Sequence, residues 1–364
     1  MKIPPYKTIG IIGGGQLGRM MCLAAKSMGY YVAVLDPTPN CPCAQVADTE
    51  ITAQYNDMEA IKKLAQISDV ITYEFENIDY DALTYLEKHA YLPQGSKVLK
   101  TTQHRFREKS TIRDMGIPIP EFQLVSGNLE EFIRYPSVLK TTMGGYDGKG
   151  QVVLKSEATL ERAITLANQE ECILESWMPF DKEISVIVAR STAGETAVFP
   201  VAENIHVNNI LHQSIVPARI SPELEAKATS YARKIAESLD AVGILAIEMF
   251  VVGDEIYINE LAPRPHNSGH YTIDACITSQ FEQHIRAVCG LPLGDTSLHT
   301  PVVMVNILGQ HMSDLNLYAP LLPNGKLHLY GKKEAKADRK MGHINLLGDI
   351  GQSLNTAESS KIWT

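Results

Sequence analysis

Two carboxylates, Glu248 and Glu260, lie on either side of a Gly-Asp turn in an otherwise apolar stretch. Residues 246–250 (AIEMF) and 256–260 (IYINE) are typical of two strands of an antiparallel hairpin. A three-residue connection would place Glu248 opposite Glu260, whereas a two-residue connection would place it opposite Asn259. Like charges facing one another in an apolar sheet are destabilising unless something neutralises them. Mg²⁺ does so with oxygen ligands from one or two carboxylates and from phosphates, so the pair predicts a magnesium site; the alternative is that one glutamate points to water.

A glycine-rich loop between two short strands is a second candidate for phosphate chemistry. The strand at 137–140 (SVLK) leads into residues 144–150 (GGYDGKG), and the strand at 151–154 (QVVL) follows. The loop does not fit the P-loop pattern, because Gly150 stands where Ser or Thr should follow the lysine. A glycine hairpin of this kind predicts a lid that folds over phosphates, with Lys140 placing a point charge on them. An ordinary flexible hairpin is the alternative.

A further glycine loop lies near the N-terminus, at residues 13–18 (GGGQLG). It follows an expected strand at 8–12 and precedes an expected helix at 19–28, which is the context of the dinucleotide-binding fingerprint. Asp36 stands where a ribose-binding carboxylate would lie. Backbone amides at a helix N-terminus can approach an anion when no side chain intervenes, so the loop indicates a phosphate-bearing ligand. The alternative is a tight turn with nothing bound.

The elements that must position these residues alternate regularly in the first hundred residues. Strands at 8–12, 30–35 and 70–73 alternate with helices at 19–28 and 57–66, which predicts a parallel sheet. Further expected elements are strands at 172–176 and 183–190 and helices at 157–168 and 222–240, followed by a strand-rich segment from about residue 292. The whole pattern predicts a mixed α/β (α+β) protein with domains at 1–100, 101–291 and 292–364.

Composition narrows the class of protein. The 364 residues carry a net charge of −9, so the sequence lacks the excess of positive charge that is typical of nucleic-acid-binding proteins. No stretch approaches the roughly 18 apolar residues of a membrane span, and the N-terminus does not resemble a signal peptide. The six scattered cysteines are expected to be reduced and mostly buried. We therefore expect a cytoplasmic enzyme that acts on small molecules.

Taken together, Lys140, the lid and the carboxylate pair resemble an ATP-grasp enzyme. Within that superfamily, strings in the right order along nearly the whole chain are similar to N5-carboxyaminoimidazole ribonucleotide synthetases. They are residues 13–20 (GGGQLGRM), 73–77 (YEFEN), 145–150 (GYDGKG), 183–188 (EISVIV), 263–270 (PRPHNSGH) and 339–343 (RKMGH). The last of these motifs are specific to that family rather than to ATP-grasp proteins in general.

The resemblance implies a fold and a reaction. The fold is ATP-grasp, with an N-terminal Rossmann-like domain and a small β-rich C-terminal domain. The reaction converts 5-aminoimidazole ribonucleotide, bicarbonate and MgATP into the N5-carboxylated ribonucleotide, ADP and phosphate, through carboxyphosphate, in purine biosynthesis. The resemblance also implies a homodimer. It reassigns the loop at 13–18 to the side of the ribonucleotide that is carboxylated.

Carried over position by position, the resemblance also implies site residues. Those expected to bind ATP are Arg105, Lys140, Gly145, Tyr146, Asp147, Gly148, Lys149, Gly150, Gln151, Glu175, Ser176, Trp177, Met178, Glu183, His206, Asn259 and Glu260. Glu248 and Glu260 are expected to bind Mg²⁺. The ribonucleotide is expected to lie against Gln16, Leu17, Glu74 and Asn267, with Lys332 and Arg339 on its 5′-phosphate. The residues expected to act on the reacting groups are Asp147 and Lys149, which reach the amine, and Arg264, which steadies bicarbonate or carboxyphosphate.

Some details depart from the family pattern or stay open. Trp177 stands at the adenine hinge, where a smaller aromatic or an aliphatic residue is expected. His266 and His270 are expected to be structural or hydrogen-bonding residues, because Pro265 and Gly269 argue against the helix that a metal-binding pair would need.

Three other functions compete with this interpretation. Another ATP-grasp ligase, such as a formate-dependent glycinamide ribonucleotide transformylase or a biotin carboxylase, would not account for the strings at 263–270 and 339–343. A nicotinamide-dependent dehydrogenase would leave the lid and the carboxylate pair unexplained. A nucleotide-binding scaffold without activity would not need every expected lysine and metal position to be filled.

Overall fold

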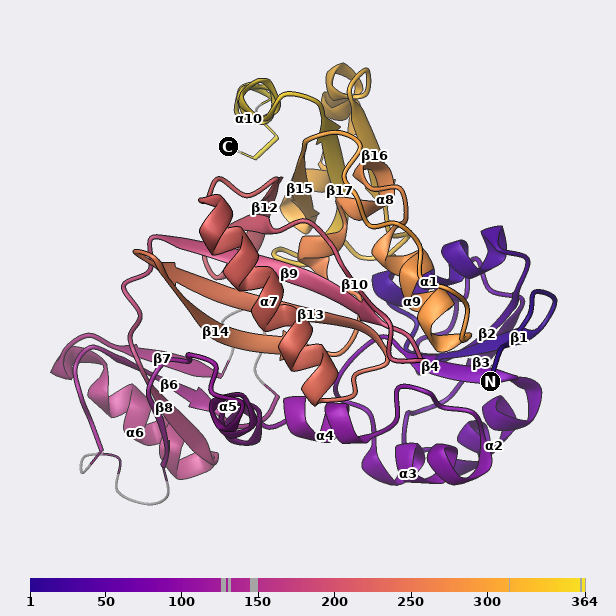
Figure 1. Ribbon diagram of the computed structural model, residues 1–364, viewed down its shortest axis with the longest axis horizontal. Helices are drawn as coiled ribbons and strands as arrows, with labels where there is room; N and C mark the ends of the chain where they lie inside the picture. The colour runs from indigo at the N-terminus through magenta and orange to yellow at the C-terminus, as the bar shows by residue number, and fades with distance from the viewer. Residues whose placement is uncertain (126–128, 130–131, 145–149, 314, 361, 364) are drawn as a thin grey trace.

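Three β-sheets form the framework of the protein in the computed structural model (Figure 1). The structure describes residues 1–364 except 126–128, 130–131, 145–149, 314, 361 and 364. One sheet is parallel and two are antiparallel, so the predicted α/β class is confirmed. Among the described residues, no helix is long and apolar enough to cross a membrane.

The N-terminal sheet is parallel, with strand order β3-β2-β1-β4. Helices α1 and α9 cover one face of this sheet, and α2 and α3 cover the other. Because both faces are buried, its two central strands are apolar almost throughout, as parallel strands require. The elements are β1 (Thr8–Ile12), α1 (Gln16–Ser27), β2 (Tyr31–Asp36), β3 (Thr49–Thr52), α2 (Met58–Ile67), β4 (Val70–Tyr73) and α3 (Tyr80–His89).

Two short helices, α4 (Lys97–Thr102) and α5 (Arg105–Asp114), lead from this sheet into a small antiparallel sheet. Its strand order is β5-β8-β6-β7, and α6 packs on one face. The register pairs Lys140 with Gln151, so β6 and β7 form the hairpin predicted for the lid, while lid residues 145–149 lie outside the described residues. The elements are β5 (Phe122–Val125), β6 (Ser137–Thr141), β7 (Gln151–Leu154), the 3-10 turn η2 (Glu157–Thr159), α6 (Leu160–Gln169) and β8 (Cys172–Ser176).

The largest sheet has nine strands in the order β14-β13-β9-β11-β12-β15-β17-β16, with β10 paired to β9. Helix α7 buries its apolar face against β9, β13 and β14, and it begins after Ser221, whose Oγ accepts from Leu224 N at 3.2 Å. The first elements of this region are β9 (Lys182–Arg190), β10 (Thr196–Val198), β11 (Ala202–Val207), β12 (Ile210–Val216), α7 (Pro222–Ser238), β13 (Gly243–Val252) and β14 (Glu255–Ala262).

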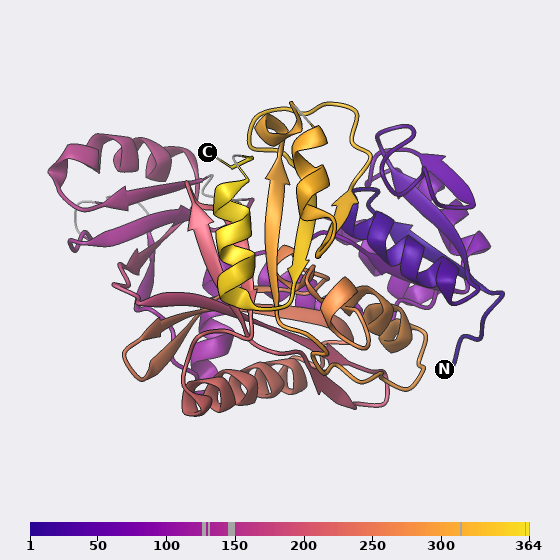
Figure 2. The ribbon, with the colours of Figure 1, turned by 90° about the horizontal axis from the view of Figure 1, so that it is seen from above.

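The strand-rich C-terminal segment extends this same sheet, because β15 pairs with β12. Figure 2 shows α10 as the yellow helix, which packs on β15 and β17 of this sheet. The domain boundaries expected near residues 100 and 292 stay predictions. The remaining elements are η3 (Asn267–Gly269), α8 (Thr272–Ala275), α9 (Gln280–Val288), β15 (Val302–Leu308), η4 (Gly309–Met312), η5 (Leu315–Leu321), β16 (Gly325–Leu329), β17 (Lys340–Leu347) and α10 (Ile350–Ser359).

All six cysteines are free and buried, as predicted. They lie in apolar surroundings; burial raises the pKa of the Cys276 thiol, for example, to about 12. Thiols in such surroundings are inert rather than reactive. They therefore contribute packing to the fold.

Candidate functional site

The carboxylate pair lies at a β-bulge in the hairpin of β13 and β14. The pairing Val252↔Glu255 leaves a two-residue turn, which alone would place Glu248 opposite Asn259. Between Glu248 and the next pair the register shifts by one residue, so Glu248 stands opposite Glu260 after all. The expected pairing is therefore present, but the bulge at Asn259 produces it rather than a longer turn.

The two carboxylates differ in their partners and in their pKa values. Arg105 Nη1 lies 3.0 Å from Glu260 Oε2, whereas Glu248 Oε1 lies 3.5 Å from His266 Nε2. Burial and the charge of Arg264 lower the pKa of His266 well below its ordinary value, so this imidazole is neutral and does not compensate Glu248. Burial, together with the charge of Glu260, raises the pKa of Glu248 to about 7. Burial would also raise the pKa of Glu260, but Arg105 outweighs it and the pKa is lowered.

This pair fits a divalent cation. Asn259 Oδ1, beside the pair, is buried and has no hydrogen-bond partner among the described residues. The described residues contain no group of three or more His, Cys, Asp or Glu side chains arranged to hold a metal. A site with two carboxylates and a neighbouring amide oxygen suits Mg²⁺, which takes its other ligands from water and phosphate.

Lys140 is held by a buried carboxylate at the edge of the small sheet. Its Nζ lies 2.9 Å from Glu175 Oε2, and Lys109 Nζ lies 3.3 Å from the same oxygen. Burial would raise the pKa of Glu175, but Lys109 and Lys140 lower it to about 2. Glu175 is therefore charged at neutral pH.

The predicted adenine hinge, Glu175 to Met178, follows directly from β8. The N–H of Ser176 donates to Glu121 O at 2.8 Å, and the N–H of Trp177 donates to Pro136 O at 3.2 Å. The Trp177 ring lies under Lys155, whose Nζ is 5.0 Å from the ring centroid. Two of the hinge amides are thus already used within the protein.

Glu183 and His206 lie on the neighbouring strands β9 and β11, and their side chains form an ion pair. Burial would lower the pKa of His206, but Glu183 raises it above its ordinary value. The structure therefore brings together two of the predicted ATP-binding residues on the large sheet, next to the strand that carries Glu248.

The amides of the loop at 13–18 bind carboxylates of the protein itself. Gly14 N donates to Asp36 Oδ2 at 2.7 Å, and the amides of Gly15 and Gly18 donate to the two oxygens of Glu74. Asp36 and Glu74 come at or directly after the ends of β2 and β4, the two neighbours of β1, and parallel strands end at the same edge of a sheet. The interpretation of these amides as a phosphate site is therefore wrong, because two carboxylates already take that place.

Glu74 also explains why the loop needs glycine. A Cβ on Gly15 would lie 2.6 Å from Glu74 Oε1, and a Cβ on Gly18 would lie 2.6 Å from Gly13 O. The glycines thus admit an internal carboxylate rather than a dinucleotide. Leu17, a predicted substrate contact, has its side chain buried in the core between α1 and α9, while Gln16 at the start of α1 is partly exposed.

The parallel sheet meets the large sheet close to the carboxylate pair. Arg264 Nη2 lies 2.8 Å from Glu76 Oε1, which joins the segment after β14 to the segment after β4. Asn267, in the 3-10 turn that follows, is buried, and both polar atoms of its side chain lack a partner among the described residues. An orphaned buried amide of this kind fits a position where a ligand supplies the missing hydrogen bonds.

The basic segment before β17 contacts the connection between β2 and β3 of the parallel sheet. Gln45 Nε2 donates to Gly331 O at 2.8 Å, directly before Lys332. Lys332 Nζ donates to Lys340 O at 2.7 Å, and the Arg339 guanidinium donates to Glu334 O at 3.0 Å. Gln45 also accepts from Arg19 of α1 at 3.1 Å, so the residue before Lys332 and the helix that begins at Gln16 share a partner.

The two histidines of the 263–270 string make hydrogen bonds. His266 Nδ1 lies 2.9 Å from Ser268 Oγ, and His270 Nδ1 lies 3.3 Å from Gln280 Nε2. The residues between them form a single 3-10 turn, not an α-helix. These contacts agree with the hydrogen-bonding role predicted for both residues.

Three charged residues in this region were missed at the level of sequence. Lys109 and Glu108 are buried on α5, where the sequence showed only a polar helix, and Glu76 pairs with Arg264. Burial and the charge of Glu260 raise the pKa of Glu108 to about 8. Glu76 lies within the recognised string at 73–77, so that string was a usable signal, whereas nothing local indicated that Lys109 is buried.

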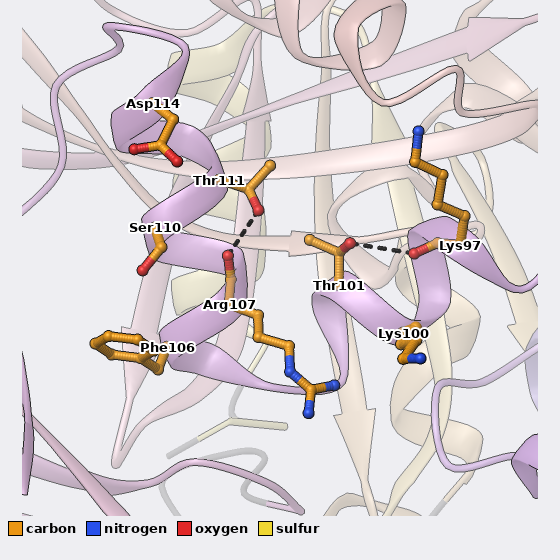
Figure 3. Close-up of a pocket in the computed structure, with 8 residues that line it drawn as sticks. All are labelled: Lys97, Lys100, Thr101, Phe106, Arg107, Ser110, Thr111 and Asp114. Atoms are coloured by element: carbon orange, nitrogen blue, oxygen red, sulfur yellow. Dashed lines mark hydrogen bonds between the residues drawn. The ribbon is translucent and has the colours of Figure 1, made fainter.

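A cavity of about 390 Å³ lies between α4 and α5, outside this region (Figure 3). Three cationic side chains of its lining, Lys97, Lys100 and Arg107, point in different directions from the two helices. It contains none of the predicted site residues. The full lining is Lys97, Lys100, Thr101, Phe106, Arg107, Ser110, Thr111 and Asp114.

Comparisons with known protein families match most of the chain. Residues 6–103 match the ribonucleotide synthetase preATP-grasp domain, and residues 110–281 match the ATP-grasp domain. Residues 302–357 match the phosphoribosylaminoimidazole carboxylase C-terminal domain.

Individual proteins of known function or structure are similar to nearly the full length of this chain. The N5-carboxyaminoimidazole ribonucleotide synthase of Bacillus subtilis is 58% identical over 351 residues, covering 95% of this chain and 92% of the relative. A crystal structure of an N5-carboxyaminoimidazole ribonucleotide synthetase with ADP has a TM-score of 0.97 at 64% identity, covering 100% of this chain and 98% of the other. The synthase of Aspergillus clavatus, in complex with ADP and the aminoimidazole ribonucleotide, has a TM-score of 0.91 at 32% identity, covering 98% and 97%.

Proposed function

The chain belongs to the N5-carboxyaminoimidazole ribonucleotide synthase family, and we propose that its reaction takes place where the two antiparallel sheets meet the parallel sheet. It is an ATP-grasp ligase that carboxylates 5-aminoimidazole ribonucleotide in purine biosynthesis, at the expense of ATP. Two observations support this location. Lys109 contacts both Glu175, the partner of Lys140 on the small sheet, and Asn259 O, beside the Glu248–Glu260 pair. Arg264, four residues after Glu260, contacts Glu76 of the segment that follows the parallel sheet.

ATP binds between the small sheet and the large sheet in this proposal. Lys140 and Arg105 contact its phosphates, and the lid, residues 144–150 with Gln151, covers them. Glu183 and His206 hold the ribose. Since the N–H groups of Ser176 and Trp177 are already used, the adenine is read by Met178 N–H and by the hinge carbonyl groups.

Glu248 and Glu260 hold Mg²⁺, with Asn259 beside them. The raised pKa of Glu248 and the orphaned Asn259 oxygen support this assignment, because both are satisfied by a cation. When bound, the ion neutralises charge on the phosphates during phosphoryl transfer. Arg105 holds Glu260 in its charged form through the ion pair, so that the site is ready for the cation.

The ribonucleotide lies between the two ends of the chain. Lys332 and Arg339 bind its 5′-phosphate, and Gln16 and the orphaned amide of Asn267 contact its polar groups. Leu17 contributes through its backbone, since its side chain is in the core. Glu74 acts by shaping the loop at 13–18, to which it is hydrogen-bonded.

The chemistry needs two displacements. An oxygen of bicarbonate attacks the γ-phosphorus of ATP, ADP leaves, and carboxyphosphate forms. The exocyclic amine then captures the carboxyl carbon of carboxyphosphate, or of carbon dioxide released from it; phosphate leaves and the amine loses one proton. Arg264, held by Glu76, steadies the bicarbonate and carboxyphosphate, and Asp147 and Lys149 reach the amine from the lid. Lid closure has a clear purpose, because carboxyphosphate is destroyed by water.

Measurement of ADP release with each substrate omitted in turn tests this proposal. Release is expected to require both bicarbonate and the aminoimidazole ribonucleotide for its full rate. Stimulation by glycinamide ribonucleotide or biotin in place of the aminoimidazole ribonucleotide would overturn the proposed acceptor. We also propose a cytoplasmic homodimer, as the family resemblance implies; sedimentation at micromolar concentration tests the dimer, and fractionation of cells tests the location.

A further inference from the structure

Lys109 is a buried lysine that joins the two sheets of the proposed ATP site. It lies on α5 with only 1% of its side chain exposed. Its Nζ donates to Asn259 O of β14 at 3.0 Å and lies 3.3 Å from Glu175 Oε2 of β8. One ammonium group therefore contacts the nine-stranded sheet and the four-stranded sheet at once.

On the small sheet, Lys109 acts on Glu175, and through it on Lys140. The side chain of Glu175 is 3% exposed, and its Oε2 forms ion pairs with both Lys109 and Lys140. A buried carboxylate without its cations is strongly destabilised, so its position follows its partners. Removal of Lys109 would leave Lys140 as the remaining close lysine partner and would draw its ammonium toward Glu175, away from a phosphate.

On the large sheet, Lys109 holds the bulge that pairs the two carboxylates. Asn259 is the extra residue of that bulge, and its carbonyl oxygen accepts from Lys109. A bulge residue is left out of the regular ladder of strand hydrogen bonds, so its backbone groups need other partners. Lys109 supplies such a partner to the carbonyl group of Asn259. If the bulge relaxed, Glu260 would move out of register with Glu248.

We propose that Lys109 is a positioning residue, which sets the phosphate-binding Lys140 and the cation-binding carboxylates at a fixed separation. It acts through Glu175 and Asn259, by joining the two sheets. The inference rests on the proposed function, in which Lys140 binds phosphate and Glu248 with Glu260 binds Mg²⁺. Its consequence is that one substitution weakens two separate binding events, one on each sheet.

The test uses Lys109→Met in the full-length chain. Calorimetric titration with ADP in EDTA reports the small-sheet side without any cation, and the Mg²⁺ concentration for half-maximal ADP release reports the large-sheet side. Loss of a supporting side chain weakens such sites roughly tenfold or more, so we expect both the ADP Kd and the half-saturating Mg²⁺ concentration to rise by about that factor.

Lys182→Met is the matched control. Lys182 Nζ lies 2.9 Å from Glu203, a carboxylate that is also 3% exposed and that has a second cation in Arg219. This variant likewise removes one of two cations from a buried carboxylate, but outside the proposed machinery. We expect a lowered Tm with ADP affinity and Mg²⁺ dependence as in the wild type.

The outcomes separate the inference from the proposed function. A Lys109→Met protein with a lowered Tm but wild-type ADP and Mg²⁺ values would show a merely structural lysine and overturn the inference. If that variant does not fold, Lys109→Gln replaces it, because the shorter neutral side chain removes the charge beside Glu175, and wild-type ADP and Mg²⁺ values in it would equally overturn the inference. Lys140→Met tests the site itself: wild-type ADP affinity there would refute the phosphate role of Lys140 and, with it, the proposed function of the site.

Discussion

At the scale of single residues, the site is dominated by like charges that need a counter-ion. Glu248 faces Glu260 across the hairpin, and Arg105 compensates only the second of them. A buried carboxylate that lacks a full partner has a raised pKa, as Glu248 has. The charge imbalance is placed beside Lys140 and Arg264, where phosphate chemistry requires a cation.

Replacement of Glu260 by alanine is expected to lower kcat for ADP release by roughly a hundredfold or more, because a preorganised charge at the reacting phosphates is lost. Thermal unfolding should still be cooperative, with a small change in Tm. Glu255→Gln is the control on the same strand, since Glu255 is exposed and pairs with Lys227. Substantial activity in Glu260→Ala would contradict the assigned cation site.

The pKa of Glu248, about 7, predicts a pH dependence of cation binding. Below pH 7 the carboxyl group holds a proton that Mg²⁺ must displace, whereas above pH 7 it is charged and free to bind. At one pH unit below this pKa, the half-saturating Mg²⁺ concentration should be about tenfold higher than at pH 8. Steady-state ADP release titrated with Mg²⁺ at pH 6, 7 and 8 measures this, and a value that does not change across this range would contradict it.

At the scale of elements, the turn from β1 into α1 is built around an internal carboxylate. The helix N-terminus offers free N–H groups and a partial positive charge, which attract anions. Glu74 supplies that anion, because β4 lies beside β1 and ends at the same edge of the sheet. In other folds the N–H groups of such a helix N-terminus bind the phosphate of a ligand. Here they bind Glu74, which connects the parallel sheet to its first helix.

Gly15→Ala is expected to destabilise the protein by about 1–3 kcal/mol, because its new Cβ would lie 2.6 Å from Glu74 Oε1 in a closely packed loop. Urea unfolding measures the free energy. Gly351→Ala in α10 is the control: its Cβ would meet only Asp349 Oδ1 at 3.3 Å, and alanine favours a helix, so stability should be unchanged or higher. Equal stabilities of Gly15→Ala and the wild type would show that Glu74 does not need the close approach.

At the scale of the whole molecule, the proposed ribonucleotide site draws on segments about 300 residues apart. The parallel sheet contacts the large sheet through Arg264 and Glu76, and it contacts the basic C-terminal segment through Gln45 and Gly331. Figure 1 shows the indigo N-terminal strands beside the orange and yellow C-terminal elements. These contacts set how far Lys332 lies from the start of α1.

Gln45→Ala removes the hydrogen bond to Gly331 O, directly before Lys332. The loss of one such bond, worth about 0.5–1.5 kcal/mol, should raise the KM for the aminoimidazole ribonucleotide by about twofold to tenfold. The KM for ATP should not change, because the adenine hinge and Lys140 lie on the small sheet. A parallel rise in both KM values would contradict a local role of this contact. Gln352→Ala, on the exposed face of α10, is the control for the loss of a glutamine side chain, and both of its KM values should equal those of the wild type.

Much of the architecture was predictable because it depends on local patterns. The strands at 8–12, 70–73, 151–154 and 172–176 have the expected bounds, since runs of apolar and β-branched residues report a strand directly. Helix α1 begins at Gln16, three residues before the expected start, because the loop's last residues already take helical form. The strings of the recognised family predicted the ATP-grasp fold and the reaction, both of which are confirmed.

Other features were decided only when distant segments packed together. The amide of Gly15 binds Glu74, which is 59 residues away along the chain. Lys109 binds Glu175, 66 residues away, and Asn259, 150 residues away. The bulge at Asn259 likewise set the register of Glu248 and Glu260 in a way that turn length alone could not. Local sequence determined which residues were available for chemistry. The order and register of the strands decided which of them meet, because a carboxylate finds its partners across a sheet rather than along the chain.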